Sequence, residues 1–436
     1  MPETTGAAGP PTLGTDATGP LARLAAAFTY RNFRNLWIGA CTSSIGTWMQ
    51  NVAENWLVLT LTNSAFYLGL DAFLGQLPIM LFTLIGGVVA DRQDRRRVLL
   101  TSQYIQMTSA FTLALLVYLQ VVHPAPGPAE HAVSMTVWYV LALSFLSGCA
   151  QAFGGPAYQS LVPALVDKKH LPNAIALNSI QFNLARIIGP LLAGLAIATL
   201  GTVFCFTMNG FSFVAVIVSL LILNIPPRDQ LPPQPLLLQL RGGLAYVRHE
   251  GPLFGLTIVA FLTTFLGMPL LTLLPVFVQK VFHLGVAEYS QMMAFQGAGA
   301  VFGALIVAWL GRFRRMGSAA LLLQVGLGGV IVAFALSRTP ALSYALLFAA
   351  GVGQIMVFSL ANSIVQLVVP NQMRGRVMSI YMVAFRSGMP LGSLTAGYLA
   401  NVFSAPTVLI FNGAMLMVVG AVVFSTYTRL RAIQPS

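Results

Sequence analysis

Four charged side chains lie inside long apolar stretches of this sequence: Glu54, Asp71, Arg186 and Arg386. A charged group is costly to place inside a lipid bilayer, so the few that occur there usually serve a function. The two carboxylates could bind and release protons, and the two arginines could bind a substrate. Each group also has a structural alternative, which is a hydrogen bond or ion pair with a neighbouring helix.

Glu54 and Asp71 are predicted to lie at similar depth in the membrane. Glu54 is near the end of the apolar stretch 35–61, Asp71 is near the start of the stretch 66–90, and a short turn around Asn63 joins the two. With a rise of 1.5 Å per helical residue, both carboxylates should lie about 10 Å below the same membrane surface.

A stripe of polar residues leads to Glu54 at helical spacing. It consists of Ser44, Thr47 and Asn51. A polar stripe on an apolar helix indicates a face that lines a water-filled cavity rather than lipid. A carboxylate in such a place can take up and release a proton in the working pH range. We therefore predict a proton-coupling role for Glu54 and Asp71.

Arg186 and Arg386 lie equally deep in two stretches that repeat each other. Arg186-Ile-Ile-Gly-Pro190 parallels Arg386-Ser-Gly-Met-Pro390 at an offset of 200 residues. Two arginines related in this way would create a positively charged centre that suits an anionic or polar substrate. Alternatively, each could bind backbone carbonyls, a carboxylate or a partner helix. The residues that we predict to line the substrate cavity are Asn51, Gln181, Asn183, Arg186, Asn362, Gln366 and Arg386.

The composition indicates that lipid surrounds most of the chain. It has 436 residues, of which 57% are hydrophobic and 8% charged, and its mean hydropathy is +0.79. Soluble domains carry about 25% charged residues. A net charge of +12 would suggest nucleic acid as a partner of a soluble protein. Here the basic residues lie in short loops, so we expect no nucleic acid.

Several kinds of chemistry lack their sequence signals. We find no Walker-type lysine loop and no cluster of Cys and His at metal-ligand spacing. We therefore predict no ATP-driven pump, no metal, no cofactor and no enzyme.

Twelve apolar stretches are long enough to cross a bilayer as helices, which takes about 20 residues. They lie near 35–61, 66–90, 98–122, 135–163, 172–200, 203–224, 253–281, 289–311, 317–337, 341–369, 373–401 and 406–427.

The basic residues alternate between the loops in a way that sets the orientation. If the N-terminus is cytoplasmic, the inner segments hold 19 Lys and Arg residues and the outer loops hold 2, Lys280 and Arg338. Membrane proteins keep Lys and Arg in their cytoplasmic loops. We therefore predict an inner (plasma) membrane protein with both termini in the cytoplasm.

The chain divides into two halves of six helices at a proline-rich segment. The repeat at an offset of 200 supports this division. The predicted parts are a disordered tail at 1–30, a bundle at 31–224, a linker with a short amphipathic helix at 225–252, a second bundle at 253–428 and a tail at 429–436.

A charged turn after the second stretch carries a recognisable motif. The segment from Gly87 to Leu99 resembles motif A of the major facilitator superfamily, G-x-L-A-D-R-x-G-R-R-x-x-L. It matches at Gly87, Ala90, Asp91, Arg92, Arg95, Arg96 and Leu99. Val89 replaces the Leu of the motif, and Asp94 stands where the family usually has Gly.

Two further segments point to a branch of this superfamily. Gly189, Pro190 and Gly194 resemble motif C of the drug and proton antiporters, which is a sign of export. The segment from Trp37 to Ser64 resembles the branch that holds enterobactin and macrolide exporters. One departure is that stretch 135–163 contains no Arg, although many proton antiporters carry one there as motif B.

The resemblance implies an all-α membrane protein with twelve transmembrane helices in two pseudo-symmetric six-helix bundles. It also implies a secondary active transporter that works by alternating access. We expect proton-coupled export of an amphiphilic small molecule, such as a drug, macrolide or siderophore, by a monomer. The alternative is an importer of a nutrient or lysolipid, and a membrane enzyme or receptor is more remote.

The charged turn is also predicted to form a gate. Asp91 ends the second helix close to where the repeat places Arg374 and Arg376, at the start of the eleventh. We predict that Asp91 latches the two halves together there, while the alternative is a turn that only sets orientation. The gating residues are predicted to be Gly87, Asp91, Arg92, Arg95, Arg96, Arg374 and Arg376.

Overall fold

A computed structural model of the chain describes residues 26–123, 136–223, 244–248, 250–311, 313–370 and 372–426, without the side chains of Asp91 and Pro252. Within these residues every regular element is a helix. The amphipathic helix predicted in the linker and the C-terminal tail lie largely or wholly outside them. In the linker, residues 244–248 are helical, with Val247 buried and Leu244 exposed.

Six long helices form the first bundle. They are α2 (Arg31–Thr62), α3 (Ala65–Arg92), α4 (Arg95–Tyr118), α5 (Val137–Leu161), α6 (Leu171–Leu200) and α7 (Thr202–Leu221). Three short 3-10 turns accompany them, namely η1 (Ala26–Thr29), η2 (Val162–Ala164) and η3 (Lys168–His170).

The second bundle begins with a broken helix and continues with five long ones. The broken helix consists of α9 (Gly251–Gly267), α10 (Pro269–Thr272), α11 (Leu274–Val276) and the π-helical turn η4 (Phe277–Val281). The others are α12 (Val286–Leu310), α13 (Met316–Leu336), α14 (Pro340–Val368), α15 (Arg374–Val402) and α16 (Ala405–Thr426).

Each of the twelve predicted stretches therefore corresponds to a helix or to a series of short helices. Nine of the described segments are long and apolar enough to cross a membrane on composition alone. The three long helices that do not meet this criterion of hydropathy and charge are α2, α4 and α15. All three begin with arginines, and α2 carries the polar stripe that ends at Glu54.

The stretch 253–281, predicted as one helix, is broken in the structure. The helix ends at Gly267 and restarts at Pro269, and a second break lies at Leu273. Proline has no N–H to donate to the preceding turn and its ring clashes with that turn's carbonyl, so Pro269 and Pro275 each favour a new helix start.

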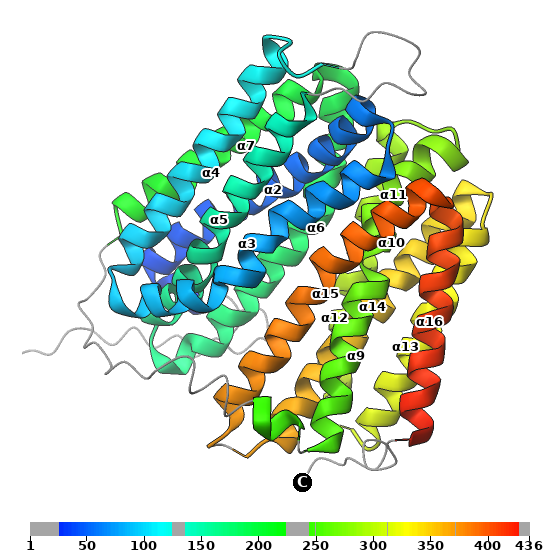
Figure 1. Cartoon of the computed structure of the whole chain (residues 1–436). Helices are drawn as coiled ribbons and strands as arrows, with labels where there is room; N and C mark the ends of the chain where they lie inside the picture. The colour runs from blue at the N-terminus through cyan, green and yellow to red at the C-terminus, as the bar shows by residue number, and fades with distance from the viewer. Residues whose placement is uncertain are drawn as a thin grey trace, which may run out of the picture.

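The two bundles repeat the same packing (Figure 1). In the first, α3 packs on α5, α2 on α6 and α7, and α4 on α5 and α7. In the second, α12 packs on α14, α9 on α15 and α16, and α13 on α14 and α16. Each pair in the first bundle has its counterpart at the equivalent place in the second, as parallel repeats require.

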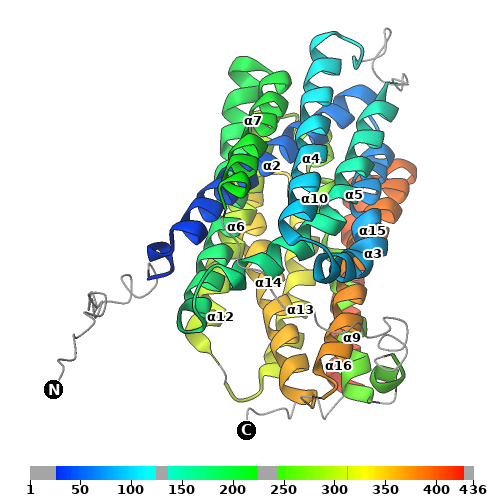
Figure 2. The same ribbon diagram turned by 90° about the vertical axis from the view of Figure 1, so that its left-hand side faces the viewer.

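In the described part of the chain, two helix pairs make most of the contact between the bundles: α3 with α15, and α6 with α12 (Figures 1 and 2). Glycine makes both contacts close. A Cβ added at Gly69 of α3 would overlap the carbonyl oxygen of Ser393 and lie 3.0 Å from the Cα of Gly397. A Cβ at Gly194 of α6 would lie 2.6 Å from the Cβ of Ser290. Small residues permit such close helix packing in membranes.

The structured part of the chain begins earlier than predicted. We assigned residues 1–30 to a disordered tail, but Ala26–Thr29 form a 3-10 turn and Ala27 is fully buried. The cause is an aromatic contact, because the ring of Phe28 packs edge-on against Trp37 with 4.9 Å between centroids. Residues 1–25 lie outside the described part.

Asp94, which departs from the family motif, caps the helix that follows it. Its carboxylate accepts a hydrogen bond of 2.9 Å from the N–H of Arg96 and lies 3.6 Å from the Nε of Arg97. Aspartate stabilises a helix N-terminus in this way, and Gly is also tolerated at that position. The replacement of Gly by Asp therefore keeps the turn and adds a cap.

Candidate functional site

A cavity of about 1780 Å³ lies between the two bundles. Residues of α2 to α7 contribute one side of it, and residues of α9, α10, α12, α14 and α15 contribute the other. Its lining runs from Asn55 and Thr272 to the exposed Arg92 and the neighbouring Arg95. We call the end with the turn between α3 and α4 the open end, and the end with the turn between α2 and α3 the closed end.

Contacts between the bundles shut the closed end. The Nζ of Lys280 donates to the carbonyl oxygen of Asn63 at 2.7 Å. The hydroxyl of Ser64 donates to Asn401 at 3.0 Å. Tyr289 stacks on Trp56 with 6.0 Å between the ring centroids, and its side chain is fully buried. Asn55 also donates to the Tyr289 hydroxyl at 3.2 Å.

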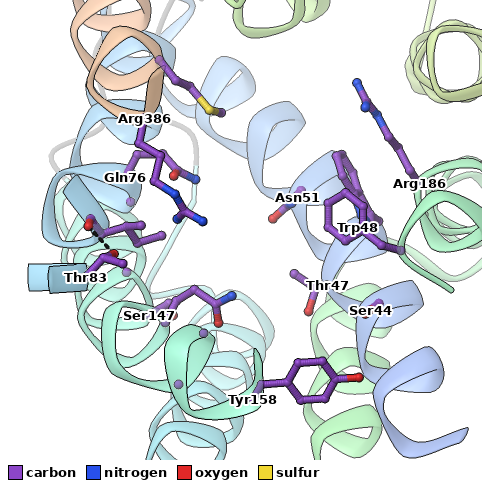
Figure 3. A pocket seen from close by; sticks show the side chains of 18 of the residues that line it. Ser44, Thr47, Trp48, Asn51, Gln76, Thr83, Ser147, Tyr158, Arg186 and Arg386 are labelled. Atoms are coloured by element: carbon purple, nitrogen blue, oxygen red, sulfur yellow. Dashed lines mark hydrogen bonds between the residues drawn. The ribbon is translucent and has the colours of Figure 1, made fainter. Parts of the chain in front are cut away.

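The polar stripe of α2 lies on the cavity wall, as predicted. Ser44, Thr47, Asn51 and Glu54 all line the cavity, and Figure 3 shows the first three on one face of the helix. Gln181 of α6 lines it as well and is held in place by two hydrogen bonds to α2, one of them 2.7 Å long to the Ser44 hydroxyl.

The structure brings Glu54 and Asp71 together through one serine. The hydroxyl of Ser144, on α5, is hydrogen-bonded to Oε1 of Glu54 and lies 2.6 Å from Oδ1 of Asp71. Gln50 donates to the other oxygen of Glu54 at 3.1 Å. Asp71 is only 7% exposed. The two carboxyl groups are therefore at the same depth, and three helices of the first bundle hold them.

This arrangement can hold one proton between the two acids. The Ser144 hydroxyl has a single hydrogen, yet two carboxyl oxygens lie within hydrogen-bond distance of its oxygen. If both acids were ionised, one of them would face only a serine lone pair. With one proton added, one carboxyl donates to Ser144 and Ser144 donates to the other. Both contacts between Ser144 and the carboxyl groups are then hydrogen bonds.

Ser144 was not predicted from the sequence. Stretch 135–163 does contain a signal for it, because Ser144, Ser147, Gln151 and Tyr158 follow one another at helical spacing, and all four line the cavity. The glycines and alanines between them make this stripe less obvious than the one on α2.

Arg186 lies on the cavity wall and bridges the bundles. Its Nη2 donates to Oε1 of Gln296 on α12 at 2.8 Å, and its guanidinium carbon lies 5.7 Å from the centre of the Trp48 ring. Gln296 continues the chain of bonds to Gln354 on α14 at 3.0 Å. The Nε of Arg186 is buried and has no partner among the described residues. Of the alternatives considered for Arg186, contact with a partner helix is the one observed.

Arg386 lines the cavity from the opposite bundle and is exposed to it. Figure 3 shows it across the cavity from Arg186. In the described part of the chain its guanidinium has no hydrogen-bond partner and no carboxylate within 4.0 Å. It also borders a smaller cavity of about 250 Å³ between α3 and α15.

Three predicted cavity residues lie elsewhere. Asn183 does not line the cavity, since it is two positions from Gln181 and so lies on nearly the opposite face of α6. Asn362 and Gln366 are also absent from the lining; α14 presents Gln354, Phe358 and Ala361 there instead. α14 does carry a stripe of polar residues at helical spacing, namely Ser359, Asn362, Ser363 and Gln366. The spacing alone did not show which neighbouring helix this stripe faces.

The predicted gating residues gather at the open end. Gly87, Arg92 and Arg95 line the cavity. Arg95 donates to the carbonyl of Ser160 on α5 at 3.0 Å, and Arg96 donates to the carbonyl of Leu221 on α7. These bonds fix the α3–α4 turn to its own bundle.

The other members of the predicted latch are not seen in contact. Arg374 and Arg376 begin α15 and are exposed. The Asp91 side chain lies outside the described part, so the predicted contact remains a prediction.

The residues that resemble motif C, Gly189, Pro190 and Gly194, occupy positions where α6 packs closely on other helices. A Cβ at Gly189 would lie 2.5 Å from the Cβ of Trp48 on α2. Pro190 is buried inside α6, and Gly194 contacts α12 as described above. The motif therefore lets α6 pack against α2 in its own bundle and against α12 in the other.

Two repeated six-helix bundles around a central polar cavity define a transporter of the major facilitator type. The sequence from residue 22 to residue 435 matches the transmembrane secretion effector family of this superfamily. The chain belongs to that family, and the predicted all-α fold and branch are confirmed.

Three relatives with assigned roles are similar over most of the chain. The multidrug efflux pump Tap of Mycolicibacterium fortuitum is 29% identical, over 83% of this chain and 87% of Tap. The staphyloferrin A transporter of Staphylococcus aureus is 25% identical, over 82% and 87%. Macrolide efflux protein A of Streptococcus pyogenes is 23% identical, over 65% and 67%.

Solved structures agree on the fold. A bacterial homologue of the human lysosomal transporter Spinster, in an inward-facing and occupied conformation, superposes with a TM-score of 0.69. The alignment covers 93% of this chain and 99% of that one at 15% identity, so it supports the fold alone.

Proposed function

We propose that this protein exports an amphiphilic small molecule, such as a drug, macrolide or siderophore, in exchange for protons. The observation that carries the proposal is the pair of carboxyl groups, Glu54 and Asp71, that share the Ser144 hydroxyl on the wall of the cavity. Such a pair can accept a proton from one side of the membrane and release it to the other. The names of the relatives, two efflux proteins and a siderophore transporter, support export of this kind of molecule.

The open end faces the cytoplasm in this proposal. The turn between α3 and α4 carries Arg92, Arg95, Arg96 and Arg97, and loops rich in arginine stay on the cytoplasmic side. Twelve crossings, one for each predicted stretch, would then leave both termini in the cytoplasm. The protein would be a monomer in the inner or plasma membrane.

Transport would proceed by alternating access. In the present conformation substrate enters the cavity from the cytoplasm, and a proton held by the acid pair occupies the site. Release of the proton to the cytoplasm leaves two carboxylates near one hydroxyl, which favours a rearrangement of the bundles. Each proton that enters supplies about 2.3 kcal/mol per 100 mV of membrane potential.

Cells that express the protein are expected to accumulate less of a macrolide or of staphyloferrin A than matched cells without it. A protonophore should remove the difference, because it removes the driving force. The measurement is the steady-state cell content of each labelled probe. If accumulation rises with expression and does not respond to the protonophore, the proton-driven export proposal is refuted.

We also propose that Asp91 latches the bundles when the open end closes. Helices α3 and α15 run antiparallel, with Gly69 against Ser393 near the closed end. Further along, Thr83 and Ser379 border the same small cavity. This register supports the proposal, because continuing it along both helices brings the end of α3, which contains Asp91, near the start of α15, which contains Arg374. A carboxylate there can bind both the arginine and the helix N-terminus.

Asp91→Asn is expected to lower the export rate about tenfold, because hydrogen bonds to charged groups contribute about 1.5–3 kcal/mol and the latched state would lose one. Initial rates of probe export from preloaded cells measure the effect. The matched control is Asp94→Asn in the same turn, where asparagine caps α4 as well as aspartate does. If the Asp91 variant exports at the wild-type rate, the latch proposal is refuted, while the proposed topology is unaffected.

A further inference from the structure

The middle of the cavity carries more positive than negative charge. Among the described side chains that line it, the charged ones away from the open end are Glu54, Asp71, Arg186 and Arg386. When the acid pair holds one proton between its two carboxyls, it contributes one negative charge. The two arginines contribute two positive charges, because guanidinium stays protonated in proteins.

Neither arginine is neutralised by the protein in the part of the chain that the structure describes. Arg186 binds the neutral amide of Gln296, and its buried Nε has no partner. The hydrogen bonds of Glu54 and Asp71 go to Ser144 and Gln50 instead. A charge inside the membrane without a counter-charge is costly. An anion that enters the cavity would remove that cost.

Each arginine also stands beside a pair of aromatic rings that line the cavity. Next to Arg186, Trp48 and Phe182 meet edge to face with 6.1 Å between centroids. Arg386 follows Phe385 in α15, and Phe385 packs against Phe358 with 4.3 Å between centroids. The two bundles thus present similar surfaces to each other, each with one cation and two rings (Figure 3 shows Trp48 and the two arginines).

We infer that the transported molecule carries an anionic group attached to an aromatic or apolar body, and that Arg186 and Arg386 bind it from opposite walls of the cavity. The anionic group would be a carboxylate, which is ionised at neutral pH and can accept two hydrogen bonds from a guanidinium. The rings would pack against the body, and the guanidinium groups would donate to the anion. This inference rests on the proposed export function and narrows its substrate class.

Three naphthalene compounds of equal length test the inference, one ending in a carboxylate, one in a primary amide and one in a trimethylammonium group. Their binding to the full-length protein in lipid nanodiscs is measured by equilibrium dialysis, with empty nanodiscs subtracted. The carboxylate should bind about tenfold more tightly than the amide, as a hydrogen bond to a charged group predicts, and the ammonium compound most weakly.

Variants then assign the effect to the arginines. Arg186→Gln and Arg386→Gln should each lower the ratio of carboxylate to amide affinity about threefold, since the two arginines share the tenfold preference, and Arg386→Lys should retain most of it. The ratio is the readout because a variant that shifts the conformational equilibrium changes both affinities by the same factor. Arg338→Gln, which removes an exposed charge outside the cavity, is the matched control and should leave the ratio unchanged.

Three results would overturn the inference: equal or tighter binding of the ammonium compound, an unchanged ratio in both glutamine variants, or binding of none of the three probes. The export proposal is judged separately. Protonophore-sensitive export of the amide or ammonium compound, without binding of the carboxylate, leaves export standing and removes the anion site. Carboxylate binding that depends on the arginines, without proton-linked transport, supports the anion site and refutes the export proposal.

Discussion

Replacing Asp71 by asparagine is expected to abolish transport against a gradient. An amide cannot take up and release a proton in the working pH range, so the pair could no longer bind a proton on one side of the membrane and release it on the other. One proton driven by about 150 mV supplies about 3.5 kcal/mol, enough to sustain an about 300-fold gradient of an uncharged probe. In the variant this gradient should fall to about one. Glu54→Gln should have the same effect, because the proton is shared.

The loss should affect coupling and spare binding. Asp71→Asn keeps the size of the side chain and leaves the rest of the cavity wall intact, so probe binding in nanodiscs should persist. The matched control is Glu288→Gln at the start of α12, where the carboxylate only accepts from the N–H of Gly285. If both variants still export the probe against its gradient as well as the wild-type protein does, Glu54 and Asp71 have no role in proton coupling.

Gly69→Ala is expected to force the closed end apart. The added methyl group would overlap the backbone of Ser393, and the backbone cannot yield as a flexible side chain can. Overpacking of this kind costs about 1–3 kcal/mol. Since the contact exists only while the closed end is shut, the equilibrium between the two conformations should shift about 5- to 150-fold. The transport rate should fall, because most molecules would stay in the conformation in which the closed end has opened.

Distances across the open end measure this shift. Spin labels at Gln93 and Gln372, two exposed positions on opposite bundles, should move closer together in Gly69→Ala than in the parent protein. The parent for this experiment has its three cysteines replaced. Gly329→Ala is the control, because nothing lies within 4 Å of a Cβ at Gly329. An unchanged distance distribution together with full transport would contradict the expected role of the Gly69 contact.

The sequence was most informative where lipid imposes a simple rule. Length and hydropathy predicted twelve helical stretches, and the structure has a helix or helical series at each. The break at Met268 was missed since hydropathy does not register a helix that stops and restarts within the membrane. Pro269 and Pro275 were the available signal, because each lacks the N–H that a continuous helix uses.

Within the cavity, sequence reasoning worked for residues fixed by short-range geometry. Glu54 and Asp71 flank one tight turn, so their shared depth could be predicted, and the common bond to Ser144 agrees with it. The partner itself lies on a helix far along the chain, and no local pattern identifies which serine it is. For the same reason the partner of Arg186 could not be predicted. Its hydrogen bond to Gln296 depends on how the two bundles pack against each other.

The polar stripe on α14 shows the limit most clearly. A helical repeat of polar residues tells which positions share a face, but the rotation of the helix in its bundle decides what that face touches. Asn362 and Gln366 are on a common face, yet the cavity side of α14 carries Gln354 and Phe358. That rotation follows from packing at Gly351, where a Cβ would approach the backbone nitrogen of Ala300 on α12 to 2.8 Å.

Proton movement in everted membrane vesicles tests the central claim most directly. Vesicles with an acidic lumen are loaded with a pH-sensitive dye, and a transported probe is added outside. Entry of the probe should carry protons out and raise the lumenal pH in vesicles with the wild-type protein, but not in vesicles with Asp71→Asn. Probe uptake by the wild-type protein without any change in lumenal pH would contradict proton-coupled export.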